Sequence, residues 1–510
     1  MFTKSSYRLH RSHRKMTGIP RLPVALFSLF LLPRLCFANP ITNDLSDLFS
    51  AHPLPGATVG VMVQSLLDGQ VYYRKNADSD LMPASNLKLL VSAAALHWLG
   101  PTFRYQTQLL YTGTITHKGV LDGNLILKGA GDPSLTTADL IQMANRVKRA
   151  GIHQINGRIV LDNHIFDDRR IGYGWECDDL PYYYAAGNGG LNVNHNLMRV
   201  QVLPGRRAGE PVHVFTKPLR TYFAVENHAV TAQAGDPSHL VVTRKMGRDV
   251  LVVSGRLAMN LSPDQYRPTV ITVNNPARYV GLLFCHILTH DDMSGLTNRS
   301  RSKPAYVIGT TPASAHLLAT HYSVALSRLL QLMNRPSDNF IAECLLKTVG
   351  AVVSHKGSDA SGIADEMRWF STLELPVDQI NVVDGSGLSR HDLVTPHFFC
   401  DLLSDMRLSS NVFTYVESLP VAGRSGTLKY RMHGTLAAGN CTAKTGSLDH
   451  VSTLSGYVTT KDGEPLCFSI LLNNFLTSDG QAEQLEDRLV EKLADIDRFV
   501  SSDSGKAGSK

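Results

Sequence analysis

The sequence predicts an α+β protein in which both chain ends build one antiparallel sheet flanked by helices, with one or two mixed or β-rich domains inserted between them. Residues 59–63 and 71–73 are apolar and flank an Asp68-Gly69 turn, which is typical of a β-hairpin. Near the other end, apolar runs predict three strands, and apolar residues at helical spacing predict a terminal helix. These elements are expected at residues 442–444, 453–458, 466–472 and 481–500.

Two further helices are expected beside this sheet. Ser85 opens an apolar run that extends from Leu87 to Leu99 and is stopped by Gly100-Pro101, as the end of a helix should be. The run from Ser337 to Val353 also favours a helix. The triplet Ser337-Asp338-Asn339 stands at its start, where such residues serve as caps, and a cap with no other role is one interpretation of it.

The stretch between about residues 101 and 305 has a mixed pattern with frequent turn signals, as in a small β domain. Strands are expected at 106–111, 125–127 and 158–161, a helix at 138–150, and more strands across 198–257. At 510 residues, two or three domains are expected. We assign them as a catalytic domain of residues 39–100 and 306–500, inserted domains at 101–305 with a β-rich part near 195–268, and a disordered tail at 501–510.

The first 38 residues are typical of a secretory signal peptide. Basic residues come first, an apolar stretch spans 22–32, and Cys36-Phe37-Ala38 ends it, so cleavage is expected after Ala38. The apolar stretch is short for a membrane span, and an uncleaved anchor or a start at Met16 are the alternatives. Without this segment the formal net charge falls from +6 to −1, so the high isoelectric point gives no argument for nucleic-acid binding.

Neither a metal nor a cofactor is expected. The 20 histidines form no His-Glu-x-x-His pair, and the chain has no P-loop and no Gly-x-Ser-x-Gly elbow. Gly129-Ala130-Gly131 lacks the third glycine of a dinucleotide fingerprint. Six cysteines remain after Cys36 and none forms Cys-x-x-Cys, so no disulfide can be assigned. Four of them lie in apolar runs and are expected to be buried: Cys285, Cys344, Cys400 and Cys467.

Three short motifs carry the chemistry: Ser85-x-x-Lys88, Ser337-x-Asn339 and Lys444-Thr445-Gly446. Each of the first two also occurs elsewhere, at Ser12/Lys15, Ser300/Lys303 and Ser409/Asn411, but only Ser85 opens an apolar helix-like run. In this order the three motifs are those of acyltransferases in which a lysine activates a serine nucleophile. On a helix, residues three apart share a face, so Lys88 is expected beside Ser85.

Acyl transfer follows from these residue types. Ser85 is the candidate nucleophile and Lys88 the base, whose pKa must fall towards neutrality through burial and a second cation, Lys444. Ser337 is expected to relay a proton between Lys88 and the leaving nitrogen. The substrate-binding candidates are Asn339 for a backbone amide, Lys444 and Thr445 for a terminal carboxylate, and Ser447, whose N–H would join that of Ser85 in an oxyanion hole.

Beyond these motifs the sequence resembles the penicillin-binding protein 4 type of D-alanyl-D-alanine carboxypeptidase/endopeptidase, the peptidase S13 family. The resemblance runs from about residue 45 to 498, including the long gap after Lys88. Similar stretches are Gly129-Ala130-Gly131-Asp132-Pro133, residues 174–179, residues 384–390 and residues 419–428. The chain departs from the pattern at Ser447, where threonine is commoner, and at Cys177.

The resemblance implies a β-lactamase/transpeptidase-like catalytic domain in a periplasmic protein. The implied activity is a serine-type D-Ala-D-Ala carboxypeptidase or endopeptidase on peptidoglycan stem peptides, inhibited covalently by β-lactam antibiotics. Peripheral membrane association and the oligomeric state stay open, and nucleic acid is not expected as a partner. Arg390 is a candidate contact for acidic groups of the stem peptide or a structural ion pair, and Asp162 and Asp178 are weaker candidates for a substrate amine.

Two competing functions stay open. A β-lactamase would use the same nucleophile but would lose the acyl group faster, and no clear carboxylate motif is present to activate its water; Glu343 is expected to serve packing or to face solvent. A non-catalytic wall-binding protein with a relic site is the second alternative. The motifs do not decide between carboxypeptidase and endopeptidase.

Overall fold

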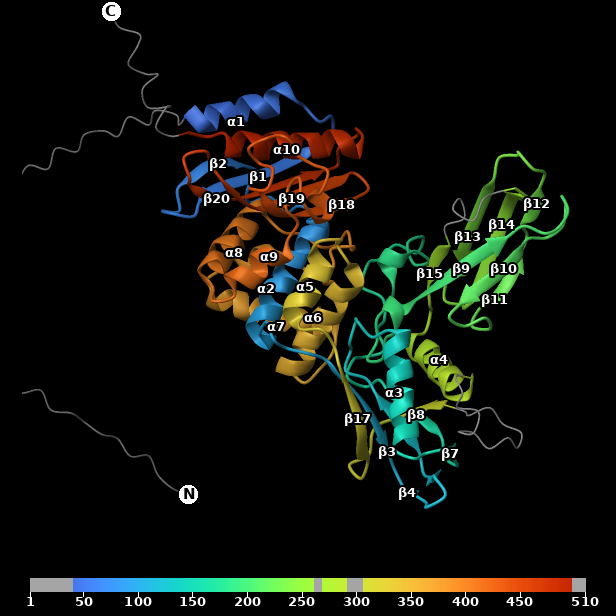
Figure 1. Ribbon diagram of the computed structural model, residues 1–510. Helices are drawn as coiled ribbons and strands as arrows, with labels where there is room; N and C mark the ends of the chain where they lie inside the picture. Colours follow the sequence, from blue (N-terminus) through green and yellow to red (C-terminus); the bar gives the residue numbers. More distant parts are fainter. Residues whose placement is uncertain (1–39, 261–267, 291–305, 498–510) are drawn as a thin grey trace, which may run out of the picture. The chain divides into compact units, whose positions relative to one another are not determined.

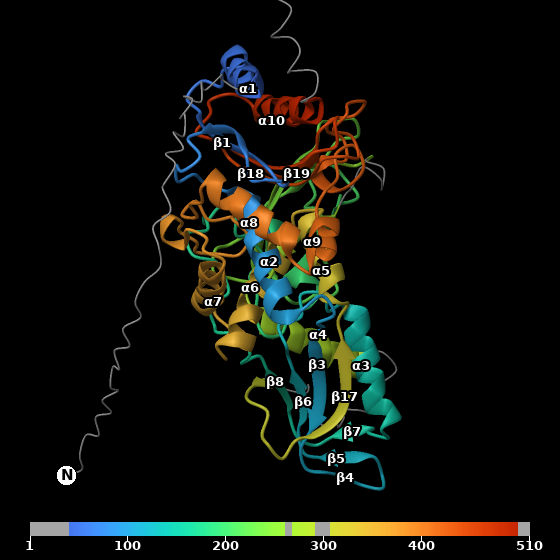
Figure 2. The same cartoon turned by 90° about the vertical axis from the view of Figure 1, so that its left-hand side faces the viewer.

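The computed structural model describes residues 40–260, 268–290 and 306–497. The expected signal peptide and tail lie outside these ranges, as do the Ser-x-x-Lys matches at Ser12/Lys15 and Ser300/Lys303. Figures 1 and 2 show the described chain from two directions. Within these ranges we find no helix with the length and apolarity needed to cross a membrane.

Both ends of the described chain contribute to one antiparallel sheet, as the sequence predicts. Its strands follow the order β18-β19-β20-β1-β2 (Figure 1). They comprise β1 (Thr58–Ser65), β2 (Val71–Lys75), β18 (Thr442–Leu448), β19 (Val451–Thr459) and β20 (Pro465–Asn473). Because β1 pairs with β20 along its whole length, the hairpin near the N-terminus is joined directly to the last strand of the chain.

Helices cover both faces of this sheet, which confirms the α+β class. One face packs on α1 (Pro40–Ala51) and α10 (Asp479–Ala494), and the other packs on α8 (Pro396–Leu408) (Figure 1). The helical half is completed by α2 (Lys88–Leu99), α5 (Leu326–Asn334), α6 (Asn339–Val353), α7 (Asp359–Thr372) and α9 (Val412–Ser418). Val61 and Val63 of β1 enter one core and Met62 enters the other, so the middle of the strand is apolar on both faces.

The terminal helix is shorter than the sequence predicts. We expected it to reach residue 500, but α10 ends at Ala494. Ile496 still packs against the core from outside the helix, which explains the apolar signal at that position. Its carbonyl accepts a hydrogen bond from the backbone N–H of Lys461 (3.1 Å), so a contact with the sheet turn replaces the next helical turn.

A second sheet, of mixed direction, lies between the nucleophile segment and the Ser-Asp-Asn segment in sequence. Its order is β16-β8-β6-β3-β17. The strands are β3 (Gln106–Tyr111), β6 (Leu125–Lys128), β8 (Ile159–Asp162), β16 (Tyr306–Ile308) and β17 (His316–Tyr322). The first three match the strands expected there. Because β16 and β17 pair with inserted strands, we propose that the inserted region continues past residue 305 to Tyr322.

The β-rich part contains two smaller sheets, of order β10-β9-β15 and β11-β14-β12, with β13 beside β14. The strands are β9 (Leu197–Leu203), β10 (His213–Lys217), β11 (Ala224–Asn227), β12 (Val230–Ala232), β13 (His239–Arg244), β14 (Val250–Ala258) and β15 (Thr269–Thr272). A three-stranded sheet of β4 (Thr114–Ile115), β5 (Val120–Asp122) and β7 (Gln154–Ile155) completes the region, together with α3 (Thr137–Arg149) and α4 (Pro276–His290).

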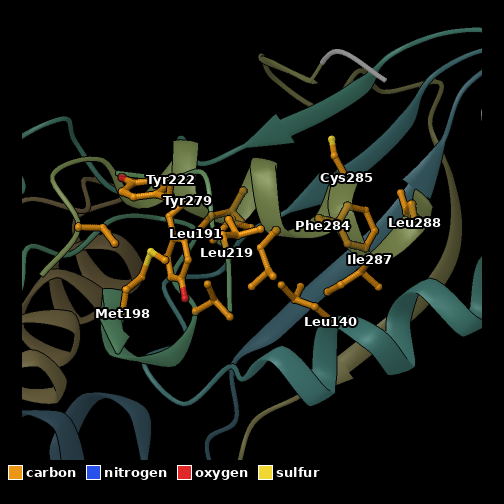
Figure 3. Close-up of a cluster of buried hydrophobic side chains, with 14 of the residues drawn as sticks. Leu140, Leu191, Met198, Leu219, Tyr222, Tyr279, Phe284, Cys285, Ile287 and Leu288 are labelled. Atoms are coloured by element: carbon orange, nitrogen blue, oxygen red, sulfur yellow. The ribbon is translucent and has the colours of Figure 1, made fainter. Parts of the chain in front are cut away.

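One hydrophobic core joins these inserted elements. Figure 3 shows side chains from α3, β9 and α4 in a single cluster, among them Leu140, Met198 and Phe284. The same cluster includes Leu109 of β3 and Leu251 of β14, so the mixed sheet and the β-rich part bury apolar area against shared neighbours.

Helix α6 connects the helical half with the inserted region. Its residues Ile341 and Leu345 pack in the core shared with α2, whereas Phe340 and Cys344 pack against Phe166 of the inserted region. On the latter side, Lys347 is 1% exposed. Its ammonium lies 2.6 Å from Asp167 and 3.7 Å from the buried carboxylate of Asp359. A buried cation therefore ties the inserted region to α6.

Replacing Lys347 with alanine should destabilise the protein by about 3 kcal/mol, because the change leaves the buried Asp359 carboxylate without its cation. Urea unfolding followed by circular dichroism measures this loss. Lys356→Ala, at an exposed lysine near the end of the same helix, is the matched control and should change the free energy of unfolding by less than about 0.5 kcal/mol. Equal effects of the two changes would contradict the assigned role of Lys347.

Candidate active site

The candidate nucleophile lies on a single 3-10 turn. Ser85 belongs to η1 (Ala84–Leu87), and the α-helix expected here begins only at Lys88. With three residues per turn, side chains at positions i and i+3 eclipse each other, which aligns Lys88 with Ser85 more closely than an α-helix would. Ala84 has a left-handed φ of 46°, a backbone strain of the kind found at active sites.

Lys88 is fully buried, and all three of its N–H donors have partners. Its Nζ donates to Ser85 Oγ (2.8 Å), to Asn339 Oδ1 (2.7 Å) and to the carbonyl oxygen of Ser386 (2.7 Å). The last two atoms can only accept hydrogen bonds. If Lys88 loses a proton, the Ser85 hydroxyl is therefore the one partner of the three that can donate to the free lone pair.

Burial dominates the electrostatics of this lysine. Desolvation lowers the pKa of Lys88 to about 8, although the carboxylates of Asp384 and Glu343 oppose the shift. Desolvation also holds the pKa of the buried Lys444 well below its usual range, and the neighbouring charge of Lys88 adds to that effect. Lys88 is thus poised to lose a proton near neutral pH, as the acyl-transfer hypothesis requires, and burial rather than the charge of Lys444 is the cause.

The carbonyl of Ser386 belongs to a loop whose backbone N–H groups donate hydrogen bonds to two carboxylates, Asp384 and Glu343. Asp384 accepts hydrogen bonds from the backbone N–H groups of Ser386, Gly387 and Ser389, at 2.7–3.1 Å, and from the Trp175 indole at 2.8 Å. Glu343 is 1% exposed and accepts from the backbone N–H of Ser386 at 2.8 Å. It therefore supports the loop by hydrogen bonding, a role beyond the packing or solvent contact expected from sequence.

The Ser-Asp-Asn triplet does form the start of α6. Asp338 is its N-cap and accepts from the backbone N–H of Ile341 (2.9 Å). Asn339 is the first helical residue, and its Nδ2 donates to the carbonyl oxygen of Tyr184 (2.9 Å) in the inserted region. Ser337 precedes the cap with a left-handed φ of 64°. Its hydroxyl lies 2.9 Å from Lys444 Nζ, so its lysine partner is Lys444, whereas we expected Lys88.

Strand β18 runs close to the nucleophile. A Cβ atom on Gly446 would lie 2.8 Å from the Ser85 nitrogen and 2.9 Å from the Pro83 carbonyl oxygen, so only glycine fits this approach. On either side of it, Thr445 shares a hydrogen bond with Thr427 (2.7 Å) and Ser447 is exposed. The Lys-Thr-Gly motif therefore places the backbone of β18 at Gly446 next to the Ser85 backbone, in addition to supplying Lys444.

These segments line a pocket of about 470 Å³. Ser85, Ser337, Asn339, Ser447 and Arg390 all contribute to its walls. The other lining residues are Glu176, Asp179, Tyr183, Tyr184, His195, Leu197, Pro336, Asp338, Phe340, Leu388, Leu448, Asp449 and Asp479. Lys88 and Lys444 are buried and contact the pocket wall by hydrogen bonds to Ser85 and Ser337.

Charged residues gather at one part of this pocket. Arg390 Nε lies 3.1 Å from a carboxylate oxygen of Glu176, and its guanidinium also donates to the carbonyl oxygen of Asp449 (3.0 Å). Neither weaker candidate, Asp162 or Asp178, is among the lining residues. Asp162 instead accepts from the backbone N–H and the hydroxyl of Thr311.

Several partners of the central side chains were not predicted. The carbonyls of Ser386 and Tyr184 belong to no side-chain motif, and only the run Asp384-Gly385-Ser386-Gly387 signals a tight turn. His195, which lines the pocket, carried no signal in the sequence either, whereas Asp179 lies in the family-like stretch 174–179 but was given no role. Among the residues that the structure describes, no group of three metal-ligating side chains is present.

Comparison with known proteins decides the family. The model of the D-Ala-D-Ala carboxypeptidase 3 (S13) family matches residues 41–496, nearly the whole described chain. The chain belongs to the S13 family. A D-alanyl-D-alanine carboxypeptidase of Actinomadura sp. (strain R39) is 34% identical over 477 residues, which are 90% of this chain and 86% of the relative.

Structural comparison agrees with this assignment. This S13 protein matches the crystal structure of penicillin binding protein 4 (dacB) from Haemophilus influenzae with a TM-score of 0.78 and 28% identity. The match covers 89% of this chain and 100% of that structure. The same Haemophilus influenzae protein complexed with a β-lactam matches with a TM-score of 0.73 and 26% identity. The resemblance inferred from the motifs is thereby confirmed.

Gly446→Ala should slow acylation of this S13 protein by penicillin by roughly 100-fold, the order expected when an oxyanion donor is displaced. The added Cβ would push β18 away from the Ser85 nitrogen. Stopped-flow kinetics with a chromogenic β-lactam measures the rate. Gly480→Ala, at a glycine with nothing near the added Cβ, is the control and should acylate normally. A normal rate for Gly446→Ala would mean that this close approach is not needed for catalysis.

Proposed function

We propose that the protein is a serine-type D-Ala-D-Ala carboxypeptidase, endopeptidase or both, acting on peptidoglycan stem peptides through an acyl-serine intermediate and acylated by penicillin. The observation that carries this proposal is the partner set of Lys88. Two obligate acceptors, Asn339 Oδ1 and the Ser386 carbonyl, take two of its N–H groups and leave Ser85 as the third partner. A neutral Lys88 is thus oriented as the base for that one hydroxyl.

Acylation begins with attack of Ser85 Oγ on the carbonyl carbon between two D-alanine units. The Oγ–C bond forms while the hydroxyl proton passes to Lys88 Nζ. The negative charge that develops on the carbonyl oxygen would be stabilised by the backbone N–H groups of Ser85 and Ser447, and one such donor lowers a barrier by about 3–4 kcal/mol. The close approach of β18 at Gly446 supports this pairing of donors.

Collapse of the intermediate breaks the C–N bond and releases D-alanine. We assign delivery of a proton to the leaving nitrogen to Ser337, whose hydroxyl gives its proton to the nitrogen and regains one from Lys444 Nζ, 2.9 Å away. Asn339 has a second N–H on Nδ2, beyond the one given to Tyr184, that can hold a substrate carbonyl. The Thr445 hydroxyl and the charge of Lys444 would hold the terminal carboxylate. Water then attacks the acyl carbon and the Oγ–C bond breaks; Lys88 returns its proton to Ser85 Oγ, and the proton lost by the water restores Lys444 through Ser337.

We propose further that Arg390, at the pocket wall, receives an acidic group of the stem peptide in exchange for its ion pair with Glu176. That pair is partly exposed, so the desolvation penalty for exchanging one carboxylate for another is small.

The proposal includes a location in the periplasm, with a cleaved signal peptide and peripheral association with the membrane. One observation supports the last point. On the exposed face of β9 and β10, Arg199 lies directly opposite Lys217, with Arg220 nearby over the ring of Phe215. Like charges opposed across two strands destabilise a sheet, which an anionic surface would relieve.

The Ser85 hydroxyl is the group on which the whole proposal depends. The protein should release free D-alanine from a pentapeptide ending in D-Ala-D-Ala, and penicillin should add one acyl group, seen by intact-mass spectrometry. Ser85→Ala should abolish both. An adduct that persists for many minutes favours a penicillin-binding enzyme, whereas rapid drug turnover would identify a β-lactamase. If D-alanine never appears, the carboxypeptidase assignment is wrong, and release of a cross-linked peptide tests the endopeptidase.

Acylation should also follow the protonation state of Lys88. Because its pKa is lowered to about 8 and only the neutral amine can accept the Ser85 proton, the acylation rate should rise between about pH 6 and pH 10 with a midpoint near 8. Lys88→Arg, which stays charged over this range, should show no measurable acylation at any of these pH values. A rate that is flat with pH in the unmodified protein would exclude Lys88 as the base.

A further inference from the structure

His195 reaches the candidate active site from the inserted region. It lies in η3 (Asn194–Asn196), where three successive residues have left-handed φ values of 52°, 54° and 54°. This conformation is costly for residues other than glycine, and asparagine tolerates it best. Both flanking asparagines are anchored: Asn194 Nδ2 donates to Thr137 Oγ1 (2.8 Å), and Asn196 Nδ2 donates to the Gly187 carbonyl oxygen (2.8 Å).

The imidazole contacts the Ser-Asp-Asn segment directly. Its Nδ1 lies 3.2 Å from Oδ2 of Asp338, and its ring stacks on Phe340 with centroids 5.3 Å apart. Asp338 thus uses one carboxylate oxygen for the cap of α6 and the other for His195. Asn339 also donates to the Tyr184 carbonyl oxygen. The inserted region therefore contacts Asp338, Asn339 and Phe340, three successive residues at the start of α6.

We propose that His195 is a positioning residue that, through Asp338, holds Ser337 and Asn339 in the geometry needed for acylation. This inference rests on the proposed function. Ser337 and Asn339 are the chain neighbours of Asp338, so a carboxylate fixed at both oxygens restrains the hydroxyl and the amide on either side of it. The inserted region is therefore a required part of the acylation machinery and not only a wall of the pocket.

Protonation should regulate this contact. Burial would lower the pKa of His195, but the hydrogen bond and charge of Asp338 outweigh burial and raise the pKa above its usual value. The charged pair is present at low pH and is lost as pH rises through that raised pKa. The other charged residues that line the same pocket are Glu176, Asp179, Arg390, Asp449 and Asp479. None of them is among the hydrogen-bond or ion-pair partners of His195 in the described chain.

His195→Asn tests the role, because asparagine accepts the left-handed backbone but cannot carry the charge. We expect penicillin to acylate this variant roughly tenfold more slowly than the unmodified protein at pH 6, and the deficit should shrink to about two- to threefold towards pH 9 as the imidazole loses its proton. His164→Asn removes another His–Asp pair of the inserted region, with a 3.1 Å separation, and should acylate normally at both pH values. The melting temperature checks that both variants fold.

A double-mutant cycle separates positioning from general loss of structure. If His195 acts through Asp338, adding His195→Asn to Asp338→Asn should slow acylation by less than about twofold beyond Asp338→Asn alone. If the two substitutions reduce the acylation rate independently, so that their fold-losses multiply in the double variant, the proposal is overturned. A reduction in the acylation rate of His195→Asn that does not change with pH would overturn it as well. Failure of the proposed function itself is a different result, since then Ser85 would form no adduct in the unmodified protein either.

Discussion

Two lysine side chains with no exposed surface, Lys88 and Lys444, set the requirements that the rest of the structure meets. Taking an ammonium group out of water is strongly unfavourable unless its donors are paired. Lys88 is paired by a hydroxyl from η1, an amide from α6 and a carbonyl from the loop after Asp384. Because these elements are far apart in sequence, the fold must assemble them before the lysine can be buried.

The acceptors of Lys88 are themselves held in position, which explains why so many polar groups are buried nearby. Asp384 accepts hydrogen bonds from three backbone N–H groups and an indole, and Glu343 accepts hydrogen bonds from backbone N–H groups of the same loop. Burial, followed by the charge of Asp384, raises the pKa of Glu343 well above its usual range. Desolvation lowers the pKa of Lys88, but nearby carboxylates, Asp384 first, oppose that shift and keep the pKa near 8. Both protonation states of Lys88 are therefore accessible at neutral pH.

Sequence predicts those parts of the site that depend on local spacing. The alignment of Ser85 with Lys88 and the cap at Asp338 follow from a few adjacent residues, and the sheet shared by both chain ends follows from its apolar strands. The carbonyls of Ser386 and Tyr184 could not be predicted, because every residue has a carbonyl and only the fold decides which one meets a donor. The end of α10 was missed for a related reason: Ile496 is apolar because it packs, not because it is helical.

Helix α6 shows why the inserted region cannot be treated as an appendage. One side of the helix packs in the core of the helical half, and the other carries Phe340, Cys344 and Lys347 against inserted residues. The inserted region therefore holds α6 at two points, at Asn339 at its start and at Lys347 about two turns later. A helix held at two points cannot tilt without breaking one of them, so the insertion restrains the position of Asn339 relative to Lys88. Asn339 accepts a hydrogen bond from Lys88 Nζ at 2.7 Å, so in the proposed mechanism this restraint would reach the base and make the inserted region part of the chemistry of Ser85.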